Sequence, residues 1–164
     1  DAAIAIDLPD EAATRALAGG LADAVAMVAP PNLVIALHGG LGAGKSVFAR
    51  AFINALPGDP EDVPSPTFTL LQTYERGDLL IHHFDLYRID DPDECIELGI
   101  EDAFVDGISL VEWPERLGPH LPAERLDVTL SLVETETARR AAIAGGGEWP
   151  SRVRAEVAPR AGHD

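Results

Sequence analysis

Apolar residues near the start of the chain follow first a strand-like and then a helix-like spacing. Residues 3–8 alternate weakly and predict a short strand, and the unbroken apolar run at 33–37 predicts a strand buried on both faces. The segment between them opens with Pro9 and Asp10 and carries apolar side chains at helical intervals, at Ala13, Leu17, Leu21, Val25 and Val28. Pro30 and Pro31 end this predicted helix.

The pattern then continues with a helix, a loop and two strands. Residues 46–56 have a helical composition, and residues 59–66 hold three prolines without any periodicity, which indicates a loop. Residues 68–74 and 79–84 are strand-like and flank a short polar turn, so we expect them to form a β-hairpin.

The second half of the chain alternates short helical and strand signals. Residues 91–94, Asp-Pro-Asp-Glu, have the sequence of a capping box and predict a short helix that ends near Gly99. Residues 108–111 predict another buried strand. The clean alternation at 126–132 predicts a half-buried strand, and residues 138–144 return beside it as a second hairpin.

The length of 164 residues suits one compact domain with a hydrophobic core. We expect this single domain to cover residues 1–147. The three glycines at 145–147 introduce a segment with scattered arginines, and we therefore expect residues 148–164 to be a loosely ordered tail.

Composition narrows the class of protein. No apolar run reaches the roughly 18 residues that a membrane-spanning helix needs. The single cysteine, Cys95, excludes an intrachain disulfide and a multi-cysteine zinc site. The acidic N-terminus lacks the charged-then-apolar pattern of a signal peptide, so we expect a cytoplasmic protein.

The charge is strongly negative and unevenly distributed. The formal net charge is −16, and residues 59–136 alone hold 20 acidic residues against 4 arginines. Such a surface repels a phosphate backbone, which argues against direct nucleic-acid binding. Among the 12 basic residues, the only lysine is Lys45.

Residues 39–46, Gly-Gly-Leu-Gly-Ala-Gly-Lys-Ser, match the phosphate-binding pattern G-x-x-x-x-G-K-[ST] between a predicted buried strand and a predicted helix. Glycines allow successive backbone amides to surround a phosphate, Lys45 reaches the β- and γ-phosphates, and the Ser46 hydroxyl ligates Mg²⁺. The candidate nucleotide contacts are Gly39, Gly40, Leu41, Gly42, Ala43, Gly44, Lys45, Ser46 and Val47.

Two carboxylates follow predicted strands and are candidates to hold the Mg²⁺ shell or to orient water. They are Asp85, after residues 79–84, and Glu112, after residues 108–111. The alternative interpretation of each residue is an ordinary solvated carboxylate at the end of a strand. Thr67 lies in Ser-Pro-Thr-Phe-Thr at 65–69, a hydroxyl-rich loop where a γ-phosphate sensor is usual.

The presence of a single lysine helps to predict which nucleotide binds. GTPases read guanine through an Asn/Thr-Lys-x-Asp element, and no second lysine exists, which favours ATP. A small-molecule kinase is the alternative enzyme, although arginines are scattered over the acidic segment where an acceptor would bind. A nucleotide-gated binding partner that hydrolyses ATP negligibly is the non-enzymatic alternative.

Three aromatic or imidazole side chains near these motifs are assigned structural roles. His82 and His83 are adjacent on a predicted strand and point to opposite faces, so they cannot share a metal ion, and we expect packing and edge roles for them. Trp113, next to Glu112, either packs over the nucleotide site or fills the core, and of the two we expect the core role.

Several motifs together resemble the TsaE (YjeE) family, over about four-fifths of the chain. They are Gly-Gly-Leu-Gly-Ala-Gly-Lys-Ser at 39–46, Ser-Pro-Thr-Phe-Thr-Leu at 65–70, His-Phe-Asp-Leu-Tyr-Arg at 83–88, Asp-Pro-Asp-Glu at 91–94 and Val-Glu-Trp-Pro at 111–114. The His-Phe-Asp-Leu-Tyr-Arg and Val-Glu-Trp-Pro blocks are far more specific than the phosphate-binding loop.

The resemblance implies a small bacterial ATPase that is required for threonylcarbamoyl modification of the adenosine next to the anticodon, in tRNAs that read codons starting with A. Such a protein does not transfer the group itself. It associates with the TsaD–TsaB pair, and its ATP hydrolysis supports turnover of that complex. It contacts tRNA only indirectly, through these partners. The cofactors implied are ATP and Mg²⁺.

The resemblance also implies roles for individual residues. Lys45 and the loop amides hold the phosphates, Ser46 and Glu112 ligate Mg²⁺, and Asp85 is an essential carboxylate near the γ-phosphate. Thr67 falls in a switch-like segment, and the helix start at Glu11 lies near the nucleoside.

The sequence departs from the family pattern in two places. Gly40 stands where the family commonly has Asp, and Ser46-Val47 stands where it usually has Thr-Thr. Serine keeps the Mg²⁺ ligand, so ATP binding is unaffected, whereas the rate of hydrolysis is left open.

We therefore expect an α/β three-layer P-loop fold, with a mainly parallel sheet, antiparallel hairpin strands and helices on both faces.

Overall fold

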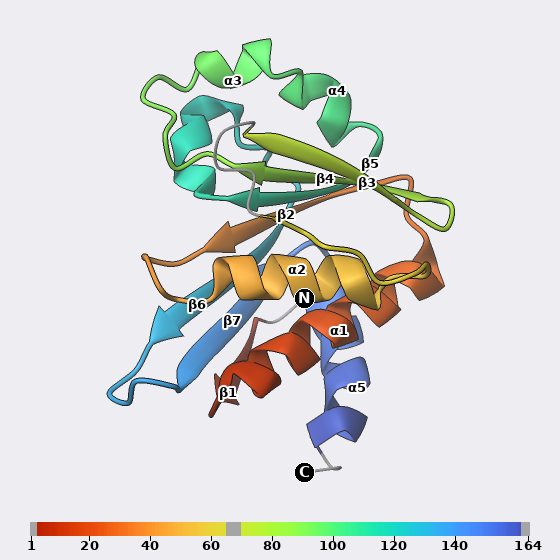
Figure 1. Cartoon of the computed structure of the whole chain (residues 1–164), viewed down its shortest axis with the longest axis vertical. Helices are drawn as coiled ribbons and strands as arrows, with labels where there is room; N and C mark the ends of the chain where they lie inside the picture. Colours follow the sequence, from red (N-terminus) through yellow and green to blue (C-terminus); the bar gives the residue numbers. More distant parts are fainter. Residues whose placement is uncertain (1–2, 65–69, 162–164) are drawn as a thin grey trace.

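A mixed β-sheet runs through the centre of the structure, a computed structural model that describes residues 3–64 and 70–161 (Figure 1). Seven strands form the sheet within these residues, in the order β1-β7-β6-β2-β5-β4-β3. Their bounds are β1 Ile4–Leu8, β2 Asn32–His38, β3 Leu71–Arg76, β4 Leu79–Asp85, β5 Gly107–Glu112, β6 Leu126–Leu132 and β7 Arg139–Gly145.

The four central strands are parallel and the outer ones antiparallel. β2 pairs in parallel with both β5 and β6, and β4 pairs in parallel with β5. β3 joins β4 as one hairpin and β7 joins β6 as the other, while β1 closes the sheet antiparallel to β7. Both predicted hairpins and the predicted combination of parallel and antiparallel strands are confirmed.

Helices cover the two faces of the sheet. One face carries α1 Glu11–Val28, α2 Lys45–Ala55 and α5 Trp149–Ala161, and the other carries α3 Glu94–Glu97, α4 Ile100–Phe104 and the 3₁₀ helix η1 Pro114–His120. Side chains of β2 alternate between the faces: Ile35 packs in the core under α1 and α2, and Val34 packs in the smaller core under α3 and α4. The result is the expected three-layer α/β arrangement.

A local sequence signal explains the start of α1. Asp10 is the N-cap of α1, and its carboxylate accepts a hydrogen bond from the Ala13 amide at 2.9 Å. The Asp91 amide donates to the Glu94 side chain at 3.2 Å, as in a capping box, but α3 begins only at Glu94 and its N-cap is Asp93 rather than the predicted Asp91. No helix in the described part of the chain is long and apolar enough to cross a membrane.

The predicted short helix that ends near Gly99 is confirmed as α3, which has four residues. A second short helix, α4, was not predicted and follows directly after Gly99. Gly99 has a φ of 79°, which ends α3 and reorients the chain. Ile100 is 1% exposed and Ala103 is 6% exposed, so α4 is held by tertiary packing against the sheet.

The expected loosely ordered tail is a helix as far as residue 161. Helix α5 packs against α1, where Val153 is fully buried. A Cβ atom on Gly20 would lie 2.8 Å from a methyl carbon of Val157, so the two helices are in close contact. Val153 and Val157 are four residues apart and share one face of α5, and the packing of the buried Val153 and the partly buried Val157 against α1 orders the segment. The boundary of the single domain at residue 147 stays a prediction.

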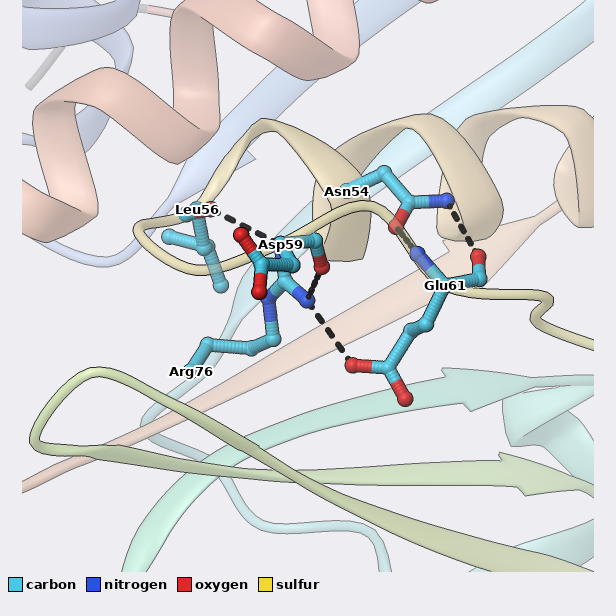
Figure 2. A network of polar contacts seen from close by, with 5 residues as sticks. All are labelled: Asn54, Leu56, Asp59, Glu61 and Arg76. Atoms are coloured by element: carbon cyan, nitrogen blue, oxygen red, sulfur yellow. Dashed lines mark hydrogen bonds and ion pairs between the residues drawn. The ribbon is translucent and has the colours of Figure 1, made fainter.

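A buried arginine braces the connection from α2 to β3 (Figure 2). Arg76, at the end of β3, is 1% exposed. Its Nη1 donates to the carbonyl of Asp59 at 2.6 Å and to Oε2 of Glu61 at 2.8 Å, and its Nη2 donates to the carbonyl of Leu56 at 3.0 Å. The Asn54 amide adds two hydrogen bonds of 3.0 Å to the backbone of Glu61. This network orders the chain that leaves α2.

Removing the Arg76 donors is expected to destabilise the fold. Arg76→Met keeps an apolar stem but leaves the buried carbonyl of Leu56 and the part-buried carbonyl of Asp59 without their donor, and an unsatisfied buried group costs about 1–3 kcal/mol. We expect urea denaturation to show a loss of about 2–4 kcal/mol. The control is Arg50→Met on the exposed side of α2, with an expected cost under about 0.5 kcal/mol. Equal losses in the two variants would contradict the proposed brace.

Candidate functional site

A glycine-rich loop joins β2 to α2 at the carboxyl end of the parallel strands. Gly39, Gly42 and Gly44 have φ angles of 149°, 79° and 107°, which residues with side chains rarely adopt. At Gly39 the packing is also close, because a Cβ atom would lie 2.6 Å from the carbonyl oxygen of Leu130. The loop leads into the N-terminus of the 11-residue helix α2, an arrangement that favours the binding of phosphate.

A cavity of about 480 Å³ opens in front of this loop. It brings together most of the predicted site residues, from three separate parts of the chain. The residues that line it are Gly40, Leu41, Gly42, Ala43, Gly44, Lys45, Ser46, Val47, Asp85, Tyr87, Arg88, Glu112 and Trp113. Gly39 lies just outside this lining, and Thr67 lies outside the described residues.

Glu112 is buried at the base of this cavity between two hydrogen-bond donors. Its side chain is 3% exposed, Ser46 Oγ donates to its Oε1 at 3.1 Å, and His83 Nε2 lies 2.7 Å from its Oε2. Ser46 and Glu112 thus present two oxygen atoms at one point beside the phosphate loop. Mg²⁺ prefers a few protein oxygens together with phosphate and water oxygens, so this pair fits the ion.

Asp85 lies beside Glu112 on the neighbouring strand. The two residues are partners in the parallel register of β4 and β5, so both predicted carboxylates stand at adjacent strand ends. Asp85 Oδ1 accepts a hydrogen bond from the Tyr87 amide at 3.1 Å, which turns the chain after β4. The Asp85 amide donates to the carbonyl of Leu70 at 3.1 Å.

Lys45 lies along the wall of the cavity rather than in solvent. Its ammonium group donates to the carbonyl of Gly39 and lies 3.4 Å from the centre of the Trp113 ring. Burial lowers the pKa of Lys45, while the nearby carboxylates of Glu112, Glu115 and Asp85 act in the opposite direction.

Trp113 packs against the smaller core, as expected, and it also lies over the site, which was the alternative role. Trp113 has a left-handed backbone, with φ 59° and ψ 52°, and its ring lies over Lys45 and 4.9 Å from the ring of Tyr87. Periodicity could not reveal this orientation, because it depends on a single unusual backbone conformation after β5.

The similarity of the chain to known proteins shows its family. The family described as threonylcarbamoyl adenosine biosynthesis protein TsaE matches residues 8–142. The chain belongs to the TsaE family. Its relatives in the family include two proteins named tRNA threonylcarbamoyladenosine biosynthesis protein TsaE. The one from Rickettsia bellii is 40% identical over 115 residues, 70% of this chain and 80% of the relative. The one from Bacillus subtilis is 40% identical over 111 residues, 67% of this chain and 68% of the relative.

The fold of this TsaE family member is also that of a solved structure. The crystal structure of YdiB from Bacillus subtilis superposes with a TM-score of 0.76 at 28% identity, and the match covers 97% of this chain and 96% of that one. The α/β class and the mixed sheet predicted from the sequence are thereby confirmed.

Glu11 lines a second cavity of about 480 Å³ on the other side of the loop. This cavity shares Gly42, Ala43, Gly44 and Val47 with the first, so the same loop forms a wall of both. Glu11 pairs with Arg15 at 2.9 Å at the start of α1. The position beside the loop is compatible with the nucleoside contact that the family resemblance implies for Glu11.

Sequence reasoning missed two contributors to this region. Arg139, in the β6–β7 hairpin, donates from Nη2 to the carbonyl of Gly42 at 3.0 Å and lines the second cavity. His83, expected to have a packing or edge role, is bonded to Glu112. The signal for His83 was its spacing of two residues from Asp85, which puts both side chains on one face of β4.

The contact between Lys45 and Trp113 predicts an optical signal. A phosphate group bound in the loop competes for the Lys45 ammonium, so the surroundings of the Trp113 ring change. We expect added ADP to alter the tryptophan emission of the unmodified protein and of Trp149→Phe, since Trp149 lines a different cavity. The change should be absent in Trp113→Phe. An undiminished signal in Trp113→Phe would show that the contact does not report on the loop.

Proposed function

We propose that this protein is an Mg²⁺-dependent ATPase that serves as an accessory subunit in the threonylcarbamoyl modification of tRNA. The observation that carries the proposal is the contact of 3.1 Å between Ser46 and Glu112 at the start of the helix that follows the phosphate loop. This contact supports the proposal, because a P-loop ATPase uses a hydroxyl and a carboxylate in this region as ligands for its metal ion.

The charge of the first cavity supports a requirement for a divalent cation. Lys45 and Arg88 face Asp85 and Glu112 in its lining, so the formal charges of these side chains cancel. The polyphosphate of ATP would add several negative charges to this balanced site. Mg²⁺ supplies the missing positive charge when it is bound with the nucleotide, and it withdraws electrons from the phosphate that is cleaved.

The proposal assigns the remaining roles in nucleotide binding and hydrolysis to individual residues. The loop amides and Lys45 hold the phosphates, and the N-terminus of α2 adds its partial positive charge. Asp85 stands on the strand next to Glu112 and is the candidate to orient the attacking water. Thr67 remains a proposed contact to the γ-phosphate from the loop before β3, and Glu11 a proposed contact near the nucleoside.

The partners proposed are the TsaD–TsaB pair, with tRNA held through that complex. ATP hydrolysis by this protein would support turnover of the complex, without transfer of the threonylcarbamoyl group. Acidic residues dominate residues 59–136, which include the exposed Glu97, Glu101 and Asp102 on α3 and α4. This surface suits a basic protein face better than a nucleic acid.

Site variants should separate the ATPase from its alternatives. We expect Lys45→Ala and Glu112→Ala each to lower ATP turnover by about 100-fold or more, because each removes a charge that acts on the phosphates or the metal ion. Turnover is measured with and without the TsaD–TsaB pair. The control is Arg154→Ala on the exposed side of α5, which should retain the unmodified rate.

Each alternative has its own result in this assay. Equal hydrolysis by all the proteins in both conditions would rule out the ATPase. Nucleotide binding without turnover in either condition would favour a nucleotide-gated binding partner, and phosphate on an added small molecule would favour the kinase.

Partner binding should depend on salt if the acidic segment takes part. We expect the affinity for the TsaD–TsaB pair to fall as salt rises from about 0.05 M to about 0.5 M, because ions screen the attraction between the two surfaces. The combined variant Glu97→Gln, Glu101→Gln and Asp102→Asn should bind less tightly and lose part of this salt dependence. Glu148→Gln, outside the segment, is the control. Salt-independent binding would mean that the acidic surface serves solubility alone.

A further inference from the structure

His83 is a buried polar residue with one recorded partner in the described part of the chain. The side chain is 1% exposed, and Nε2 lies 2.7 Å from Oε2 of Glu112. A carboxylate oxygen can only accept, so Nε2 carries the proton and donates. Nδ1 is buried and has no hydrogen-bond partner among the described residues. Within the described residues, the contact with Glu112 is therefore the one hydrogen bond of the imidazole.

The two oxygens of Glu112 are held from two different elements. Ser46, at the start of α2, contacts Oε1, and His83, on β4, contacts Oε2. With Oε2 held by the imidazole, rotation of the carboxylate is restricted and Oε1 stays directed at Ser46. The orientation of the two candidate Mg²⁺ ligands therefore depends on a third residue that does not itself face the cavity.

We propose that His83 is a positioning residue that orients Glu112 for Mg²⁺. The proposal rests on the proposed function of Glu112 as a metal ligand and adds a residue that supports it. Hydrogen bonds to the far oxygen of a ligating carboxylate restrain its orientation, and their loss typically weakens metal binding by about 10–100-fold. Substitution of His83 should act on the metal-dependent part of nucleotide binding and spare the part due to the loop amides and Lys45.

The chain contains a matched control in the preceding residue. His82 is also a histidine on β4, but it points to the opposite face, where Nε2 lies 2.8 Å from the carbonyl oxygen of Asp106. A general effect of losing a histidine from this strand would appear in both positions. An effect through Glu112 would appear at position 83 alone.

The test measures the affinity for ADP by calorimetry in EDTA and in excess Mg²⁺. The ratio of the two dissociation constants gives the enhancement by Mg²⁺. We expect His83→Leu to reduce this enhancement by about 10-fold or more while the affinity in EDTA stays within about 2-fold of the unmodified protein. His82→Leu should leave both values unchanged. His83→Gln should restore most of the enhancement, because its terminal amide can reach Glu112 as Nε2 does.

The outcomes distinguish this proposal from the proposed function. An unmodified protein that does not bind ADP, or binds it equally with and without Mg²⁺, would contradict the Mg²⁺-dependent ATPase itself. A normal enhancement in the unmodified protein that persists in His83→Leu would overturn the role of His83 alone.

If His83→Leu does not fold, two polar variants at the same position provide the test. His83→Asn is polar, but its shorter amide cannot reach Oε2, so it should lose the enhancement that His83→Gln keeps. Equal enhancement in the Asn and Gln variants would overturn the proposal.

Discussion

The burial of one carboxylate constrains the arrangement around the phosphate loop. Glu112 is 2% exposed at the end of β5, and a buried charge is tolerated only when its oxygens are paired. Ser46 and His83 supply the two hydrogen bonds. Because these residues come from α2 and β4, the start of the helix and two neighbouring strands must meet at a single point. The phosphate loop, which lies between β2 and α2, is held in place by the same contacts.

Local signals were sufficient for much of the fold. The continuous apolar run of β2, the glycine pattern of the loop and the hairpin sequences each specify their own conformation, and the structure has all of them. That Asp85 and Glu112 each end a strand also followed from sequence, whereas their position side by side comes from the parallel pairing of β4 with β5.

The features that sequence reasoning missed depend on contacts between distant segments. Helix α5 is ordered because Val153 finds a buried position on α1, and nothing within residues 149–161 reveals that partner. The role of His83 depends on the register of β4 against β5, and that of Trp113 depends on a left-handed backbone angle. Such features follow from tertiary packing, which a local pattern does not encode.

The order of the strands has a consequence for how the chain folds as it is synthesised. β2 lies between β5 and β6, so Asn32 can pair with Gly107 only after that later residue has been synthesised. In the same way, Ile4 of β1 pairs with Ile143 of β7. Pairings between such distant residues slow folding, because long segments must be closed before the contacts form. Before β7 has emerged from the ribosome, β1 and one edge of β6 lack the strand with which they pair. Open strand edges of this kind promote aggregation, so fragments that stop before residue 139 are poor candidates for soluble expression.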